Sequence, residues 1–323
     1  VVEQAQYTTQ YALGAFFRSQ NGGLWTENQR QDLTFRLYKA KFTSQIGSAL
    51  FNNPELDESN DYIKKLNSNP VRTLPKTGKI GIQTALDIAL KGWTPIIADV
   101  NSERLNNASK KLRKYKHYCI LADISTQSGI KDCISQSHKD SGQIDAAIYS
   151  AYPRSKGWSK AFEEINEDNL AEDLKLQLGS AILFSKEIIT YFLKQGFGNL
   201  IHISSIQGIS APKFSHYKGT NMVSPIEYSA IKSGIIAITK WLAKYYKGTN
   251  IRINCIAPSL TNSKIAQPLL KNTIIAEGIA KAHPMKRIGE GKDAAAMAKF
   301  LLTEESSWIT GQIIGVDGGR SSI

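Results

Sequence analysis

Apolar and polar positions divide most of this chain into two kinds of segment. From about residue 94 onward, short apolar runs alternate with longer stretches whose apolar residues recur at helical spacing. Because the runs are apolar throughout, each strand would be buried on both faces, as in a parallel sheet covered by helices. The pattern predicts a three-layer, doubly wound α/β fold. Its expected strands are "TPIIAD", "HYCILAD", "IDAAIYSA", "NLIHISS", "IRINCIAP" and "QIIGVDGG", and its expected helices span 102–115, 126–139, 168–195, 226–247 and 290–303.

Several predicted strands end on residues that could serve a site. Doubly wound sheets bind their ligands at the carboxyl ends of the strands, where the strand order reverses. One crevice at that edge is therefore expected to gather the residues at these ends, which are Asp99, Asp123, Ala151, Ser205 and Pro258.

The first seventy residues do not follow this alternation. Phe35, Tyr38, Phe42 and Ile46 recur at helical spacing within them. We interpret residues 1–70 as a mostly helical extension and residues 71–323 as the α/β domain. The pattern indicates no function for the extension.

The composition of the chain bears on which kinds of molecule it could bind. Lys and Arg number 40 against 28 Asp and Glu, which gives a formal net charge of +12. This excess could indicate a nucleic-acid partner, an anionic substrate or a solvated basic surface. The lysines are scattered and no basic run carries interleaved aromatic residues, so the ordinary solvated surface is favoured. No apolar run reaches the length of a membrane span and no convincing signal peptide is present. We expect a cytoplasmic protein with no membrane partner.

Cysteine and histidine usage adds no metal chemistry. The three cysteines, Cys119, Cys133 and Cys255, lie far apart in segments that are apolar or helical, which is typical of free thiols in a reducing compartment. The five histidines have no ligand spacing with one another or with the cysteines. No metal site is predicted.

The stretch "EYSAIKSG" holds the strongest chemical signal. Tyr228 and Lys232 are four residues apart, so on a helix they share one face, and a nearby ammonium lowers the pKa of a phenol. Such a phenol can exchange a proton with a carbonyl or alcohol oxygen, which Ser205 at the preceding strand end could orient. The same spacing is also typical of a half-buried tyrosine beside a surface lysine. Its setting between "HISS" and "NCIAP" favours the catalytic interpretation.

These motifs resemble those of the short-chain dehydrogenase/reductase family. "HISSIQG", "EYSAIKSG", "IRINCIAPS" and "GQIIGVDGG" occur in the family's order, and the resemblance covers about residues 71–320. "SAYPRSK" and the insertion "HYKGTNMVSPIEYSAIKS" resemble the subgroup found with flagellin-glycan and surface-polysaccharide synthesis. The resemblance implies a Rossmann-like fold, an NAD(P)-dependent interconversion of a ketone and a secondary alcohol on a sugar or activated sugar, and a homodimer or homotetramer.

The resemblance also assigns catalytic roles. It makes Tyr228 the proton donor or acceptor, Lys232 the residue that lowers its pKa and holds the nicotinamide ribose, and Ser205 the hydroxyl that positions the substrate. The family's fourth member is an asparagine on the preceding long helix. Gln177 stands at that place, with a side chain one methylene longer.

The cofactor end departs from the family pattern. Gly78, Lys79, Ile80 and Gly81 precede a helix as a dinucleotide-binding turn would, but Pro75 falls where the family has a glycine, and proline lacks an N–H. Asp99 comes 18 residues after Gly81, where a carboxylate accepts from ribose hydroxyls and favours NAD over NADP, while Lys79 would attract a 2′-phosphate. Matching positions add Asp123, Ile124, Ala151 and Pro258.

Substrate contacts are expected from two loops. The insertion between Ser205 and Tyr228 offers Gln207, His216 and Tyr217, which suit a polyhydroxylated or phosphorylated ligand, although an ordinary polar surface loop has the same composition. In the loop after another strand end, Tyr152 and Arg154 could face the same ligand.

A second class of function follows from the altered turn. The chain could be a dehydrogenase-like scaffold that has lost tight nucleotide binding and serves as a structural or regulatory subunit. The joint presence of Ser205, Tyr228 and Lys232 favours the enzyme, because a scaffold has no use for that set.

Overall fold

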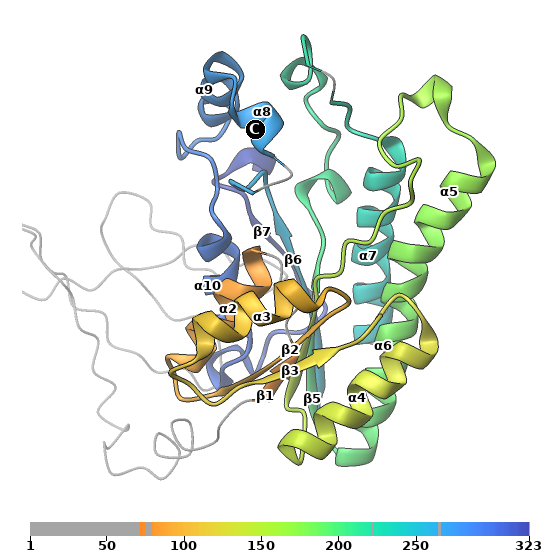
Figure 1. Cartoon of the computed structure of the whole chain (residues 1–323), viewed down its shortest axis with the longest axis vertical. Coiled ribbons are helices and arrows are strands. Elements are labelled where there is room, and N and C mark those ends of the chain that lie inside the picture. The colour runs from red at the N-terminus through yellow and green to blue at the C-terminus, as the bar shows by residue number, and fades with distance from the viewer. Residues whose placement is uncertain (1–71, 75–78, 221, 264–265, 323) are drawn as a thin grey trace, which may run out of the picture. The chain divides into compact units, whose positions relative to one another are not determined.

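A computed structural model describes residues 72–74, 79–220, 222–263 and 266–322, so the expected extension at residues 1–70 lies outside it. The described chain contains a seven-stranded sheet in the order β3-β2-β1-β4-β5-β6-β7, and every neighbouring pair is parallel (Figure 1). This confirms the predicted doubly wound α/β fold. The strands are β1 (Arg72–Leu74), β2 (Thr94–Asp99), β3 (Tyr118–Leu121), β4 (Ala146–Tyr149), β5 (Gly198–Ile203), β6 (Ile251–Pro258) and β7 (Ile313–Val316).

Helices cover both faces of the sheet (Figure 1). Alternate residues of a strand face opposite layers: in β4, Ala147 packs in the core with α4, α6 and α7, whereas Ile148 packs in the core with α2 and α10. Burial on both faces explains why the strands read as continuous apolar runs. The helices of the two layers are α4 (Gln127–Ser141), α6 (Ser180–Gln195) and α7 (Ile226–Tyr245), and α2 (Lys79–Ala89), α3 (Ser102–Leu112) and α10 (Gly291–Leu301).

The long helix expected at 168–195 is interrupted. It consists of α5 (Glu167–Leu174), a π-helical turn η2 (Lys175–Gly179) and α6. Ser180 Oγ donates to the carbonyl of Leu176 at this turn. The single-helix prediction is therefore wrong here, and the turn carries Gln177 into the interior.

Three strands end two residues earlier than predicted. β3 ends at Leu121, β4 at Tyr149 and β5 at Ile203. The residues beyond these ends form turns instead of strand pairs. Ser205, for example, accepts from Gln207 N at 3.2 Å and caps the short helix η3 (Ile206–Gly208).

Short elements complete the described chain. The helices α8 (Gln267–Leu270) and α9 (Thr273–Lys281), which the sequence pattern did not predict, lie beyond the β6 and β7 end of the sheet in Figure 1. Among the described residues, no helix combines the length and apolar character that crossing a membrane requires. The remaining turns are η1 (Phe162–Glu164), η4 (Phe214–His216), η5 (Glu304–Ser306) and η6 (Arg320–Ser322).

Candidate active site

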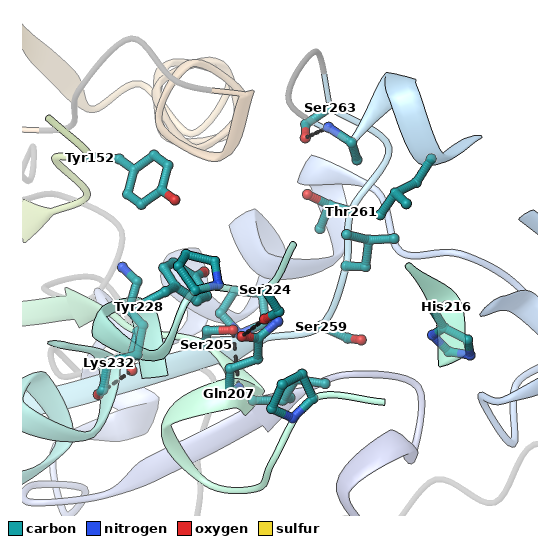
Figure 2. Close-up of a pocket in the computed structure, with 18 of the residues that line it drawn as sticks. Tyr152, Ser205, Gln207, His216, Ser224, Tyr228, Lys232, Ser259, Thr261 and Ser263 are labelled. Carbon is teal, nitrogen blue, oxygen red and sulfur yellow. Dashed lines mark hydrogen bonds between the residues drawn. The ribbon is translucent and has the colours of Figure 1, made fainter. Parts of the chain in front are cut away.

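A cavity of about 470 Å³ opens at the carboxyl ends of β4, β5 and β6 (Figure 2). This edge adjoins the point between β1 and β4 where the strand order reverses, and ligands of doubly wound sheets bind there. Its volume falls within the range of small-molecule sites. Ala151, Ser205 and Ser259, which follow the three strands or lie at their ends, line it together with Tyr228 and Lys232 of α7.

The three residues of the proposed proton-transfer site come together here. Ser205, Tyr228 and Lys232 lie on the same side of the cavity in Figure 2. Lys232 is 5% exposed; its Nζ donates to the carbonyl of Ile203 at 3.3 Å and lies 5.5 Å from the centroid of the Tyr228 ring. Neighbouring elements therefore hold a phenol, a hydroxyl and an ammonium around one space.

The electrostatics of this group differ from the expectation that Lys232 makes the phenol acidic. Burial raises the pKa of Tyr228, Ser205 lowers it in part, and Tyr217 raises it further. Burial also lowers the pKa of Lys232 to about 8. Loss of water disfavours both the phenolate and the ammonium, and this effect outweighs their proximity. Tyr228 is consequently a protonated phenol at neutral pH, and Lys232 still carries most of its charge.

An aromatic group frames the phenol. The rings of Tyr152, Trp158 and Tyr228 meet edge to face, with centroids 5.7 Å apart for Tyr152 with either partner and 6.3 Å apart for Trp158 and Tyr228. The Tyr152 ring also lies 5.6 Å from Lys232 Nζ and 5.5 Å from Arg154 Cζ. Trp158 was not among the residues predicted from the sequence. It lies in the same loop as Tyr152, and its aromatic side chain could have marked it as a further candidate.

Gln177 is placed differently from the catalytic trio. Its side chain is 1% exposed, does not line the cavity, and has no hydrogen-bond partner for either amide atom within the described chain. Its backbone carbonyl accepts from Tyr149 Oη at 3.4 Å and from Ser180 Oγ at 3.3 Å. A catalytic role for Gln177 stays a prediction.

The predicted substrate residues line the cavity. They are Tyr152, Arg154, Gln207, His216 and Tyr217. Gln207 Oε1 accepts from Ser224 Oγ at 2.7 Å, which fixes its amide. In Figure 2, His216 lies across the cavity from Tyr228 and Lys232.

Only some of the predicted cofactor residues line the cavity. Ile80, Ala151 and Pro258 line the cavity. Gly78 is outside the described residues, and only the backbone of Lys79, which begins α2, is described. Tyr228 and Lys232, which were also expected to contact the cofactor, line the cavity as well. The other four, Gly81, Asp99, Asp123 and Ile124, lie on α2, at the end of β2 and just after β3 and are not among the lining residues.

Asp99 is already engaged by a cation. Its side chain is 2% exposed, and its Oδ1 accepts from Arg104 at 2.5 Å (Nη2) and 3.1 Å (Nε). Asn101 N also donates to this oxygen, at 2.9 Å. A carboxylate and a guanidinium thus lie together at the carboxyl end of β2, where dinucleotide-binding folds of this type contact the adenosine ribose.

The cavity residues fit a nicotinamide dinucleotide. The hydroxyl of Ser150, in the cavity wall after β4, is buried without a hydrogen-bond partner in the described chain and is free to meet a ligand group. Ile80 brings the first turn of α2 to the wall, and the N–H groups of a helix start favour phosphate. Among the described lining residues none is Asp or Glu, so nothing there repels an anionic ligand.

Gly208 fixes the distance between Ser205 and α7, which makes a testable prediction. A Cβ at Gly208 would lie 2.7 Å from the backbone C and O of Lys232, closer than real contacts allow. Gly208→Ala should push η3 away from α7, lower turnover by about tenfold or more and lower the melting temperature. Gly278→Ala, in α9 with nothing within 4 Å of the new Cβ, is the matched control and should keep full activity. Equal activity of the two variants would contradict this packing role.

Known proteins resemble this chain over most of its length. A family profile described as Enoyl-(Acyl carrier protein) reductase matches residues 76–321. The post-translational flagellin modification protein A of Campylobacter coli is 35% identical over 248 residues, which cover 75% of this chain and 94% of that protein. A short-chain type dehydrogenase/reductase from Mycobacterium ulcerans has the same fold, with a TM-score of 0.70 at 20% identity over 78% of this chain and 90% of that one. So does an actinorhodin polyketide ketoreductase solved with NADPH, with a TM-score of 0.70 at 18% identity over 79% of this chain and 98% of that one.

Proposed function

The chain belongs to the short-chain dehydrogenase/reductase family of oxidoreductases, and we propose that it uses NAD(H) to interconvert a ketone and a secondary alcohol on a sugar-like compound. The observation that carries the proposal is the convergence of Ser205, Tyr228 and Lys232 on one cavity at the carboxyl edge of the sheet. An unrelated use of this cavity would not require a phenol, a hydroxyl and a buried ammonium side by side.

The chain's own residues manage the proton. Bound nicotinamide supplies or accepts the hydride. Ser205 orients the substrate oxygen, and the protonated Tyr228 phenol donates to that oxygen as negative charge develops on it. Lys232, with Nζ 5.5 Å from the ring, stabilises the phenolate left behind and is in place to bind the nicotinamide ribose. The raised pKa of Tyr228 supports its role as a proton donor, which suits ketone reduction.

The walls of the cavity support a polyhydroxylated substrate. Tyr152 and Trp158 offer aromatic faces beside Tyr228, and the amide of Gln207 and hydroxyls such as Ser259 and Thr261 offer donors and acceptors. The likeness to a flagellin modification protein of Campylobacter coli points the same way. A sugar ring or an activated sugar combines the apolar faces and hydroxyls that such a lining accommodates.

Exposed apolar residues on two long helices support a homo-oligomer. On α7, the rings of Trp241 and Tyr245 stack 4.6 Å apart and are 60% and 64% exposed. On α6, Ile182 and Leu193 are 48% and 45% exposed. Pairing of these helices between two copies would cover the apolar surface.

Cofactor binding tests the proposal directly. Titration with NADH and NADPH, followed by nucleotide fluorescence and by thermal shift, should give saturable binding with tighter binding of NADH, because a 2′-phosphate would face the Asp99 carboxylate. The absence of binding to either nucleotide would reject the enzyme and leave a scaffold.

The Asp99 and Arg104 pair makes the cofactor preference testable by mutation. Asp99→Ser removes the carboxylate and leaves the Arg104 guanidinium without its 2.5 Å partner. The variant should shift the ratio of NADPH to NADH affinity by about tenfold or more toward NADPH, because arginine accommodates a 2′-phosphate. The double variant Asp99→Ser, Arg104→Ala is the matched control and should lose that gain. An unchanged ratio in the single variant would show that Asp99 does not select the cofactor.

A further inference from the structure

All the lysine, arginine and carboxylate side chains found among the described lining residues of the cavity are cationic ones. Its described lining residues include the cations Arg154, Lys213, Lys232 and Arg320 and neither an aspartate nor a glutamate. None of these four makes an ion pair with a described residue. Unpaired cations around a concave site focus a positive potential on whatever binds there.

Part of this charge gathers away from the catalytic phenol. Lys213 precedes η4, His216 ends it, and Arg320 begins η6 near the end of the described chain. Burial lowers the pKa of His216, and the charges of Lys213, Arg320 and His283 lower it further, so segments far apart in sequence bring their cationic groups to one place. We call Lys213, His216 and Arg320 the outer cluster.

His216 of the outer cluster lies across the cavity from the catalytic group. In Figure 2, His216 lies on the far side from Tyr228 and Lys232, with Ser259 and Thr261 between them. The adjacent residue Tyr217 is near enough to Tyr228 to raise the pKa of that phenol. A ligand that contacts both ends must therefore extend along the lining formed by η4 and the segment after β6.

The donors of the outer cluster are largely uncommitted. Arg320 donates one hydrogen bond, from Nη1 to the carbonyl of Ala282 at 3.4 Å, and no hydrogen bond is assigned to the side chains of Lys213 or His216 within the described part of the chain. His283 differs, because its Nδ1 donates to the carbonyl of Ile279 at 2.7 Å and its Nε2 lies 2.7 Å from Ser259 Oγ, so both ring nitrogens already have partners. His283 thus links α9 to the segment after β6, whereas most donors of Lys213, His216 and Arg320 remain available to a ligand in the cavity.

We propose that Lys213, His216 and Arg320 form an anion subsite that binds a phosphate group of the substrate, at the end of the cavity opposite the reacting carbon. The assignment rests on the proposed function and narrows it to a phosphorylated sugar. Lysine and arginine donors that come from separate segments can reach different oxygens of a phosphate, and charge-assisted contacts to phosphate are the strong ones. Binding energy from a remote phosphate would hold the carbonyl at Tyr228. The phosphates of the cofactor belong instead at the start of α2, on another part of the wall.

Calorimetric titration of inorganic phosphate into the NADH-saturated protein tests the subsite. Lys213→Gln and Arg320→Gln should each weaken phosphate binding by about tenfold, the effect of losing one charge-assisted hydrogen bond. The matched controls Lys139→Gln on α4 and Arg113→Gln after α3, both exposed and outside the lining, should bind phosphate as the parent does. Acetate should bind more weakly than phosphate in the parent protein.

Each outcome decides the assignment. Absence of phosphate binding, or equal weakening in the variants and their controls, overturns the subsite, and acetate binding as tightly as phosphate overturns the choice of phosphate. Arg320→Lys, which keeps the charge, should recover part of the affinity, and thermal unfolding of every variant shows whether it folds. NADH affinity is measured in the same samples. If NADH does not bind, the proposed function is refuted, and the same phosphate titrations of the parent and variants without NADH still decide whether the anion subsite exists.

Discussion

Tyr228→Phe is expected to abolish turnover while leaving NADH affinity within about twofold of the parent. The variant removes one oxygen, and with it the proton that the substrate oxygen needs when hydride arrives at carbon. General acid catalysis contributes about 10²- to 10⁴-fold to a rate, so a loss of that size in kcat is expected. The aromatic packing with Tyr152 and Trp158 depends on the ring and should persist in phenylalanine.

The Tyr228→Phe result is measured as NADH oxidation at saturating substrate, alongside fluorescence titration of NADH. Tyr115→Phe, at a partly buried tyrosine between α3 and β3 that does not line the cavity, is the matched control and should retain full turnover. Retained turnover in Tyr228→Phe would remove the phenol from the mechanism. A loss of NADH affinity equal to the loss of turnover would show that the phenol serves binding alone.

Lys232→Met is expected to lose activity and gain stability. Burial lowers the pKa of Lys232 from 10.5 to about 8, so at neutral pH the folded protein bears the cost of a buried ammonium. Methionine keeps most of the chain length without the charge. We expect kcat to fall by a factor comparable to that of Tyr228→Phe, NADH affinity to fall as well, and the free energy of unfolding at pH 7 to rise by on the order of 2 kcal/mol.

The pH dependence of stability follows from the same shift. Above pH 10.5 Lys232 is neutral in both the folded and the unfolded state, and below about pH 8 it is charged in both, so the penalty accumulates as pH falls between those values. The stability gain of Lys232→Met should therefore shrink as pH rises from 8 toward 10.5. Denaturant unfolding at several pH values measures it. A variant less stable than the parent at pH 7, or a gain that does not change with pH, would contradict the buried-charge account.

Local patterns sufficed for six of the seven strands that the structure describes, all except the short β1, and for the three residues of the proton-transfer site. Runs such as "TPIIAD" are apolar on both faces because β2 is buried on both, and the four-residue spacing of Tyr228 and Lys232 places them on one face of α7. The position of Ser205 at the site could be predicted because the residue comes just after β5, at the carboxyl edge of the sheet. These features depend on local periodicity, which a single sequence displays directly.

Features that depend on tertiary contacts leave no local pattern in the sequence. The π-helical turn at Lys175–Gly179 shifts backbone hydrogen bonds without a change in the apolar pattern, so the segment 168–195 reads as one helix. The pKa of Tyr228 was predicted in the wrong direction because spacing reports the nearby ammonium and not the depth of burial. Arg320 and Lys213 line the same cavity although they are more than a hundred positions apart in the sequence, and no local pattern indicates such a neighbourhood.

A crystal structure of the NADH complex would show whether Tyr228 can deliver a proton beside the nicotinamide. We expect the nicotinamide ring in the cavity at the carboxyl ends of β4, β5 and β6, with its ribose hydroxyls bonded to Lys232. The Tyr228 and Ser205 hydroxyls should both face the space beside the reacting carbon of the ring. NADH bound elsewhere on the protein, or side chains packed between Tyr228 and that carbon, would contradict this expectation.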